Sequence, residues 1–430
     1  MFISVQEAIK KEKGKVSIHG WVYRERKQKD MIFLVIRDSS NIIQAVIKQD
    51  KVSKKEWDDA NRLLIESSVE IEGELKEDKR APTNYEIQAS KLNVIQFAEI
   101  FPINKDQSPE LLLDNRHLWL RSRKMTSILK IRSTVFGAIH NFFRNNGFYE
   151  FQSPIIQSTQ AEGGSTLFNL DYFGKKLFLA QTWQLYAEPA IFSLEKVYCI
   201  APSFRAEKSK TSRHLTEYWH AEMEVAWASF KDIQDYGENL IKFIVNEVLK
   251  NNKEELKILE RNIEKLEPAV KKPFPRITYT EALKILKEKA KMKIEWGKDL
   301  RTIEEDKLSH LYNAPVIVTD YPKIVKAFYM KENPEDPKVV FGCDFIAPEG
   351  YGEIIGGSER EPDPKKIIAR LKEQNENPEN YKFYLDTRKY GSVPHGGFGM
   401  GVERIVSWIC GLDNIKDAIP YPRTMLRYTP

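Results

Sequence analysis

The chain has 430 residues, which suggests two or three folded units at roughly 100 to 200 residues per domain. Hydrophobic residues make up 41% and charged residues 30%, which excludes a disordered, collagen-like or disulfide-scaffold protein. No apolar run reaches the roughly 18 to 20 residues that cross a bilayer, and the first residues lack a secretory signal, so we expect a cytoplasmic protein with no membrane partner. The net charge of +5 permits a polyanionic partner without requiring one.

The first hundred residues predict a small β-barrel. Short β-rich runs alternate with turns at 20–47, 69–75 and 85–95, and a helix is expected at 54–65. This pattern is typical of a five-stranded barrel of the OB type, which we place at residues 1–100. Prolines and polar residues at 101–109 mark the domain boundary, and a linker is expected over 101–121.

Residues 122–430 predict one α+β domain. Its first helix is expected over 122–145, because apolar residues recur there every three or four positions, at Ile128, Ile131, Val135, Ile139 and Phe142. Strand-like runs follow at 148–157, 177–180, 196–201, 220–227, 316–319, 339–346 and 353–355. Helices do not alternate strictly with these runs, which favours a mostly antiparallel sheet flanked by helices. The Lys- and Glu-rich stretch near 251–312 is interpreted as a helical insertion with a solvated charged face.

Two segments carry the residues best suited to chemistry. The sequence FRAE at 204–207 places Arg205 and Glu207 on one face of an expected strand, because side-chain direction repeats every two residues. An arginine can bind a phosphate and a carboxylate can accept from an exocyclic amine, although this pair alone is more often a cross-strand ion pair. The glycine-rich HGGFGMG at 395–401 lets the backbone approach a ligand closely, and Arg404 follows one turn into the next helix.

Together these segments resemble the three motifs of the class II aminoacyl-tRNA synthetases. Motif 1 matches the helix that ends before Pro154, motif 2 matches FRAE with its following loop, and motif 3 matches GMGVER at 399–404. With an OB-like domain in front, the whole chain is similar to the subgroup that charges aspartate, asparagine and lysine tRNAs. The resemblance implies a homodimer through motif 1. The apolar face at 128–142 could supply that interface or could be ordinary core.

The resemblance also implies ATP as a substrate. Arg205 would bind the α-phosphate and Arg404 would lie near the γ-phosphate, which makes these two the expected catalytic residues. Glu207 would accept from the adenine amine, Tyr218 would stack on adenine, and His214 would help to hold the phosphates.

Magnesium is the implied cofactor. Asp344 and Glu353 match the family's magnesium-binding carboxylates, and Glu353 thereby also belongs to the ATP site. Hard oxygen ligands beside phosphates are what this ion prefers. Gly356 stands where some relatives carry a serine ligand, so the number of ions stays open.

Four residues are implied as contacts of the amino-acid substrate. Glu162 lies in a glycine-containing loop that would close on the substrate and face its ammonium group, and Gln184 matches a contact of the amino group. Arg360 would donate to the side-chain oxygen, while Glu222 would accept from an amide nitrogen. That pair fits asparagine and penalises aspartate, although Glu222 could instead form a strand salt bridge. Ala187 stands where aspartyl enzymes have a lysine that pairs with the substrate carboxylate.

The barrel is implied to bind the anticodon by stacking and basic contacts, as OB folds hold single strands. Phe33 matches the residue that stacks on the middle uridine, and Gln44 matches the residue that reads its edge. Arg24 and Arg26 are candidate phosphate or base contacts, or simply solubilising residues of a hairpin.

The expected function is therefore activation of L-asparagine by ATP and its transfer to the 3′ end of tRNA(Asn). The segment DFIAPEGYGEIIGGS at 344–358 also resembles asparaginyl-tRNA synthetases more than aspartyl ones. Three alternatives stay open: an aspartyl-tRNA synthetase, an aspartate-activating asparagine synthetase paralogue, and a non-catalytic RNA-binding protein of synthetase fold. The anticodon barrel argues against the second. The third conflicts with the joint presence of Arg205, Glu207, Asp344, Glu353 and Arg404.

Overall fold

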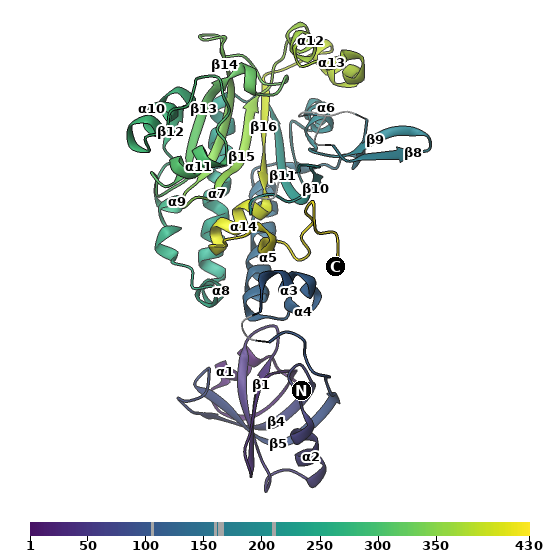
Figure 1. Cartoon of the computed structure of the whole chain (residues 1–430), viewed down its shortest axis with the longest axis vertical. Helices are drawn as coiled ribbons and strands as arrows, with labels where there is room; N and C mark the ends of the chain where they lie inside the picture. The colour runs from purple at the N-terminus through teal and green to yellow at the C-terminus, as the bar shows by residue number, and fades with distance from the viewer. Residues whose placement is uncertain (105–106, 159–160, 162–166, 209–211) are drawn as a thin grey trace. The chain divides into compact units, whose positions relative to one another are not determined.

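A computed structural model of the chain describes residues 1–104, 107–158, 161, 167–208 and 212–430. The chain divides into two compact units, Met1–Leu118 and Trp119–Pro430 (Figure 1). Each unit has a hydrophobic core of its own, as separate domains do.

The N-terminal unit is built on a closed barrel with the strand order β1-β2-β3-β5-β4. Its strand pairs are antiparallel except β3 with β5, which run parallel. The five-stranded barrel expected from the sequence is thus confirmed. The elements up to the boundary are α1 (Val5–Lys11), β1 (Gly14–Lys27), β2 (Met31–Arg37), β3 (Ile42–Lys48), α2 (Lys54–Arg62), β4 (Ser68–Glu77), β5 (Tyr85–Gln96), α3 (Pro109–Asp114) and α4 (Arg116–Trp119).

Alternating side chains close this barrel around its core. In β2, Ile32 and Leu34 are fully buried while Phe33 between them is only partly buried, because successive residues of a strand point to opposite faces. The helix predicted at 54–65 is α2. It begins with a capping box between Ser53 and Glu56, which satisfies the first backbone N–H groups.

The C-terminal unit is organised by an eight-stranded sheet of order β12-β13-β14-β15-β16-β11-β10-β6. Only the outermost pairs, β12 with β13 and β10 with β6, run parallel, which confirms the mostly antiparallel sheet. A small sheet of order β7-β9-β8 carries a hairpin that projects away from the main sheet in Figure 1. The strands are β6 (Tyr149–Glu150), β7 (Ile156–Gln157), β8 (Asn169–Tyr172), β9 (Lys175–Leu179), β10 (Lys196–Phe204), β11 (Glu217–Ala226), β12 (Arg276–Thr278), β13 (Val316–Pro322), β14 (Val339–Ala347), β15 (Gly352–Glu359) and β16 (His395–Gly401).

Helices of this unit pack on the sheet and on one another. The first helix, α5, packs against α7, and α7 in turn contacts β14, β15 and β16. The helices are α5 (Arg123–Asn145), α6 (Gln184–Leu194), α7 (Phe230–Asn251), α8 (Lys253–Ile258), α9 (Pro268–Lys271), α10 (Tyr279–Lys289), α11 (Thr302–Ser309), α12 (Pro364–Glu373), α13 (Lys382–Lys389) and α14 (Val402–Cys410).

The apolar stripe of α5 is part of the hydrophobic core. Ile128, Ile131, Val135 and Ile139 are fully buried within the chain itself, together with residues of α7 and α14. Of the two expectations for this stripe, the core is therefore the one that the structure bears out. Its side chains are not available to form an interface with a second copy.

Three expectations about strands and helices need correction. The run at 148–157 forms only the two short strands β6 and β7. The strand expected to carry Arg205 and Glu207, β10, ends at Phe204, so both residues follow the strand, although the Arg205 N–H still pairs with the Thr216 carbonyl at 2.9 Å. The stretch 251–312 is largely helical, but it also contributes β12 to the edge of the main sheet.

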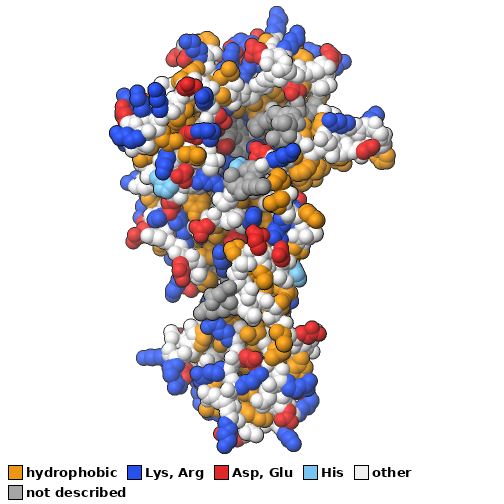
Figure 2. All heavy atoms as spheres, viewed as in Figure 1, with side chains coloured by type: hydrophobic (Ala, Val, Ile, Leu, Met, Phe, Trp, Pro, Cys, Tyr) orange, Lys and Arg blue, Asp and Glu red, His pale blue; other side chains and the backbone are white. Residues whose placement is uncertain are grey.

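The surface carries both signs of charge. On the face shown in Figure 2, Lys and Arg side chains are interspersed with Asp and Glu rather than gathered into one field, in keeping with the small net charge. In the described part of the chain, no helix is long and apolar enough to cross a membrane. The cysteines Cys199, Cys343 and Cys410 are buried free thiols.

Candidate functional site

A cavity of about 610 Å³ opens on the main sheet of the C-terminal unit. Its walls come from the start of α6, from β11, β14, β15 and β16, and from the segment 324–330. A smaller hollow of about 90 Å³ adjoins it and shares four lining residues with it. These shared residues are Arg205, His220, Glu353 and Gly399. The two spaces thus meet at one arginine, one histidine and one carboxylate.

All six residues expected to bind ATP line the smaller hollow: Arg205, Glu207, His214, Tyr218, Glu353 and Arg404. Antiparallel pairing brings them together, since β11 lies between β10 and β16, and β16 is also paired with β15. The Arg205 guanidinium carbon stands 5.9 Å from the centre of the Tyr218 ring. From the start of α14, Arg404 donates from Nη1 to the Glu353 carbonyl at 2.6 Å and lies 3.3 Å from its carboxylate.

His214 lies among cations. Its Nε2 is 3.6 Å from a carboxylate oxygen of Glu207. Burial lowers the pKa of His214, and the charges of Arg404 and Arg205 lower it further, while Glu207 opposes them. Three arginines line this hollow beside three glutamates, and the arginines are the groups that could bind an anion such as a polyphosphate.

The expected metal ligands, Asp344 and Glu353, face each other across neighbouring strands β14 and β15. Asp344 Oδ2 accepts from Lys326 Nζ at 2.7 Å. The other oxygen, Oδ1, and Glu353 Oε1 both lie within 4 Å of the point where a Cβ of residue 356 would stand. Gly356 therefore leaves a small space between the two carboxylates, at the place where a serine would reach.

Three carboxyl groups, those of Asp344, Glu353 and Glu305, influence one another's charge at this part of the cavity. Burial raises the pKa of Asp344 to about 6, with Glu353 adding to the rise and Lys326 opposing it. Burial also raises the pKa of Glu305 to about 7, again with a contribution from Glu353. Burial disfavours charge on Glu353 as well, but Arg404, Lys326 and Arg205 outweigh it and lower the pKa of this carboxyl. Carboxylates that repel one another in a buried site gain most from a cation.

The donor set fits magnesium. Two carboxylates on one side of the cavity match an ion that takes one or two protein carboxylates and completes its shell with phosphate oxygens and water. Among the described residues, no group of three or more metal-ligating side chains comes together, so a cage made entirely of protein ligands is not found there. Asp344 and Glu353 are the residues that would hold the ion.

Three of the expected amino-acid contacts, Gln184, Glu222 and Arg360, line the larger cavity. Glu162 lies outside the described residues. Glu222 is almost fully buried and accepts from the Trp183 backbone N–H at 2.8 Å and from the Thr182 hydroxyl. These bonds hold its carboxylate at the cavity wall, with His220 Nδ1 at 3.5 Å.

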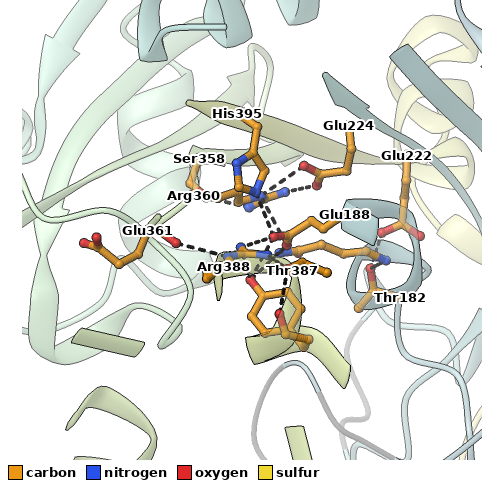
Figure 3. A network of polar contacts seen from close by, with 12 residues as sticks. Thr182, Glu188, Glu222, Glu224, Ser358, Arg360, Glu361, Thr387, Arg388 and His395 are labelled. Atoms are coloured by element: carbon orange, nitrogen blue, oxygen red, sulfur yellow. Dashed lines mark hydrogen bonds and ion pairs between the residues drawn. The ribbon is translucent and has the colours of Figure 1, made fainter. Parts of the chain in front are cut away.

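Arg360, at the end of β15, is held by an ion pair and a hydroxyl. Its Nε donates to Glu224 Oε2 at 3.3 Å, its Nη2 donates to Glu224 Oε1, and its Nη1 donates to Ser358 Oγ at 2.5 Å (Figure 3). Both members of the pair are almost fully buried. The guanidinium is thereby fixed in one orientation at the cavity wall. Ala187 is fully buried in an apolar cluster with Trp183 and Ile191.

The four expected anticodon contacts share the outer face of the barrel. Arg26 is paired with Phe33 and Arg24 with Val35 across β1 and β2, and Val35 is paired with Gln44 on β3. Side chains paired across antiparallel strands lie on the same side of a sheet. The Arg26 guanidinium stacks 4.7 Å above the centre of the Phe33 ring.

Sequence reasoning missed several residues of the site. Lys326 lies in no motif, and only the folded chain brings it to Asp344. Glu224 had a local signal, since it follows Glu222 by two positions on β11 and so points to the same side. Glu188 had one too, because it lies one helical turn after Gln184 on α6. On the barrel, Glu86 joins the expected face by accepting from Gln44 Nε2 at 2.9 Å.

Comparison with known families supports this geometry. The family model described as tRNA synthetases class II (D, K and N) matches residues 108–425, and a model described as an OB-fold nucleic acid binding domain matches residues 16–95. Among curated proteins, an asparagine–tRNA ligase of Thermoplasma acidophilum is 51% identical over 97% of both chains. One from Thermococcus gammatolerans is 50% identical with the same coverage.

A solved structure gives the same result in three dimensions. The crystal structure of asparaginyl-tRNA synthetase from Pyrococcus horikoshii complexed with asparaginyl-adenylate matches with a TM-score of 0.96 and 46% identity over the full length of both chains. Family model, curated relatives and structure cover both units of this chain. The chain therefore belongs to the class II tRNA synthetases of the D, K and N group and, within that group, to the asparagine–tRNA ligases.

Proposed function

We propose that the chain activates L-asparagine with ATP and transfers the activated amino acid to the 3′ end of tRNA(Asn). The observation that carries this proposal is the pair of adjoining cavities, which meet at Arg205 and Glu353. The smaller one contains the arginines Arg205 and Arg404, and the larger one contains the fixed Arg360 and the carboxylate of Glu222. An ATP α-phosphate at Arg205 would lie where the carboxylate of an amino acid in the larger cavity can reach it.

The first step follows from charge and position. An oxygen of the amino-acid carboxylate forms a bond to the α-phosphorus, and the bond to the departing pyrophosphate breaks. The nucleophile is already ionised and needs no general base. Arg205 and Arg404 would stabilise the negative charge on the transferring and leaving phosphoryl groups. Magnesium held by Asp344 and Glu353 would neutralise further phosphate charge.

In the second step the tRNA 3′-hydroxyl attacks the carbonyl carbon of the adenylate. A new ester bond forms, the bond to AMP breaks, and the hydroxyl proton is released. The outer face of the barrel, with Phe33, Gln44, Arg24 and Arg26, would bind the anticodon and so bring the correct tRNA to the site.

Selection of asparagine would rest on Arg360 and Glu222. The guanidinium would donate to the side-chain oxygen, and the Glu222 carboxylate would accept from the amide nitrogen. Aspartate would place a second oxygen against Glu222, and a site built for a hydrogen bond rejects the mismatched partner strongly. Glu162, Gln184 and Glu207 complete the proposed contacts, and magnesium, a homodimer and a cytoplasmic location belong to the same proposal.

The test is amino-acid-dependent exchange of pyrophosphate into ATP, with asparagine and aspartate compared at equal concentration in the presence of magnesium. We expect exchange driven by asparagine. Exchange driven by aspartate would show that the proposed amino acid is wrong, while the proposed reaction with ATP would stand. Silence with both amino acids, in protein shown to be folded, would leave only the non-catalytic alternative.

A further inference from the structure

Glu188 is a fully buried carboxylate that does not itself line the larger cavity. Figure 3 shows it among Arg360, Arg388 and His395. Its Oε1 accepts from Gln184 Nε2 at 2.9 Å and lies 3.9 Å from Arg360 Nε. Gln184 and Arg360 both line the cavity and are both proposed contacts of the amino acid. One carboxylate oxygen therefore faces the two side chains that would grip opposite ends of the substrate.

The second oxygen of Glu188 ties this pair to elements far along the chain. Oε2 accepts from the Tyr384 hydroxyl at 2.9 Å and from Arg388 Nη2, both on α13, and stands 3.0 Å from His395 Nε2 on β16. None of these side chains has more than a small exposed fraction. Glu188 thus links α6, α13, β16 and Arg360, the residue that follows β15, through polar contacts.

Side chains of opposite charge face each other in this network. Two guanidiniums, Arg360 and Arg388, face two carboxylates, Glu188 and Glu224. Buried charges of one sign are costly unless charges of the other sign accompany them. Because Arg360 already has a carboxylate on each side, it can donate to a neutral amide without a counter-ion from the substrate.

The two carboxylates do not hold their charge equally. Burial raises the pKa of Glu224, and the neighbouring Glu188 adds to that rise although Arg360 opposes it. For Glu188, burial acts in the same direction, but Arg388, His395 and Arg360 outweigh it and lower the pKa of this carboxyl. Glu188 is therefore the more permanent negative charge of the two.

We propose that Glu188 is a positioning residue that fixes Gln184 and Arg360 and, through its negative charge, makes the pocket prefer an amide over a carboxylate side chain. The proposal rests on asparagine being the substrate. Glu188 does not touch the substrate. Its charge offsets Arg360 from behind, so that a substrate carboxylate would gain less from this guanidinium than it would beside a neutral residue 188. Replacing Glu188 by glutamine makes the network one charge more positive, and this shift would favour aspartate.

The experiment compares asparagine- and aspartate-driven ATP–pyrophosphate exchange in wild type and Glu188→Gln. We expect kcat/KM for asparagine to fall about tenfold, mainly through KM, since a hydrogen bond to a charged group contributes about that factor or more. Relative to asparagine, aspartate should gain, so that the ratio of the two kcat/KM values falls by about tenfold or more. Glu188→Asp, which keeps the charge, should retain most of the discrimination.

Variants of Arg388, the partner of Glu188, distinguish an effect of the Glu188 charge from an effect of packing. Arg388→Gln removes a positive charge, so its asparagine-to-aspartate ratio should not fall. The double variant Glu188→Gln/Arg388→Gln restores the balance and should recover a ratio near that of wild type. A structural role alone predicts equal losses for both amino acids and no recovery in the double variant, and that result would overturn the proposal. If Glu188→Gln itself fails to fold, a double variant that folds and has a ratio far below that of wild type would overturn it.

Glu238→Gln is the matched control. Glu238 is also a buried carboxylate, and it accepts from the Phe274 N–H at 3.1 Å and pairs with Lys242 and Arg276. This variant should lose stability without a change in the amino-acid ratio. An unchanged ratio in Glu188→Gln, beside normal asparagine-driven exchange in wild type, would refute only the role of Glu188. Silence of wild type with asparagine would instead refute the proposed function.

Discussion

Replacing either of two glycines of β16, Gly397 or Gly399, by alanine should have different effects, one on folding stability and the other on the site. A Cβ at residue 399 would stand 2.4 Å from His220 Nε2, and one at residue 397 would stand 2.1 Å from the Met223 carbonyl oxygen. Ordinary contacts of this kind lie at 3.4–4 Å, so an alanine at either position overlaps its neighbour by about 1 Å or more. The difference is that His220 is a side chain that can turn away, whereas Met223 O belongs to the paired strand β11.

Gly399→Ala should therefore keep the fold and damage the site. A displaced His220 ring moves into the junction of the two cavities, where ATP is proposed to bind. Overpacking of this kind costs about 1–3 kcal/mol, and if that cost falls on ATP binding, the KM for ATP rises about tenfold or more. Gly397→Ala should instead lose about 1–3 kcal/mol of folding stability, because two paired strands must move apart.

Urea unfolding and ATP–pyrophosphate exchange at varied ATP and saturating asparagine measure both quantities on the same two proteins. Gly399→Ala should unfold at a urea concentration close to that of wild type. The reasoning fails if Gly399→Ala binds ATP normally, or if it loses more stability than Gly397→Ala.

Three further outcomes are expected. Arg132→Met should cost about 3–5 kcal/mol in urea unfolding, because Arg132 pairs at 2.7 Å with Glu403, whose carboxylate would stay buried and unpaired; a loss under about 1 kcal/mol would contradict this. Phe33→Ala should weaken tRNA binding in a filter assay by about 1–3 kcal/mol while leaving tRNA-independent exchange unchanged. Burial raises the pKa of Glu305 from 4.5 to about 7, so the fold favours its neutral form, and metal-free wild type should lose stability as the pH rises through this range. In Glu305→Gln the urea midpoint should depend less on pH over the same range. Equal pH dependence of the urea midpoint in both proteins would refute this prediction.

Local patterns account for the parts of the fold that were predictable from the sequence. The barrel and most strands of the main sheet could be predicted from β-rich runs. The segment HGGFGMG forms β16, which leads into α14, and its repeated glycines made this segment recognisable in the sequence. Where a strand ends is a different matter. β10 ends at Phe204, one residue before Arg205, and the sequence pattern did not mark this end, because a strand boundary depends on pairing with a distant segment.

The candidate site shows the same division. Arg205, Glu207 and Arg404 could be named because they stand in motifs whose neighbours are close in sequence. Lys326 could not, since it meets Asp344 only through the packing of β13 and its following turn against β14. The Glu188 network could not be predicted from the sequence either, because Arg388 lies 200 positions after Glu188 in the chain.

The three cysteines make the protein convenient for labelling. Burial raises the pKa of the Cys199, Cys343 and Cys410 thiols, and only the thiolate reacts with alkylating reagents. A cysteine introduced at an exposed barrel turn, such as Lys79→Cys, would take a maleimide dye while the native thiols stay unmodified. Fluorescence from that one position can then report on the barrel as tRNA binds, without a cysteine-free background.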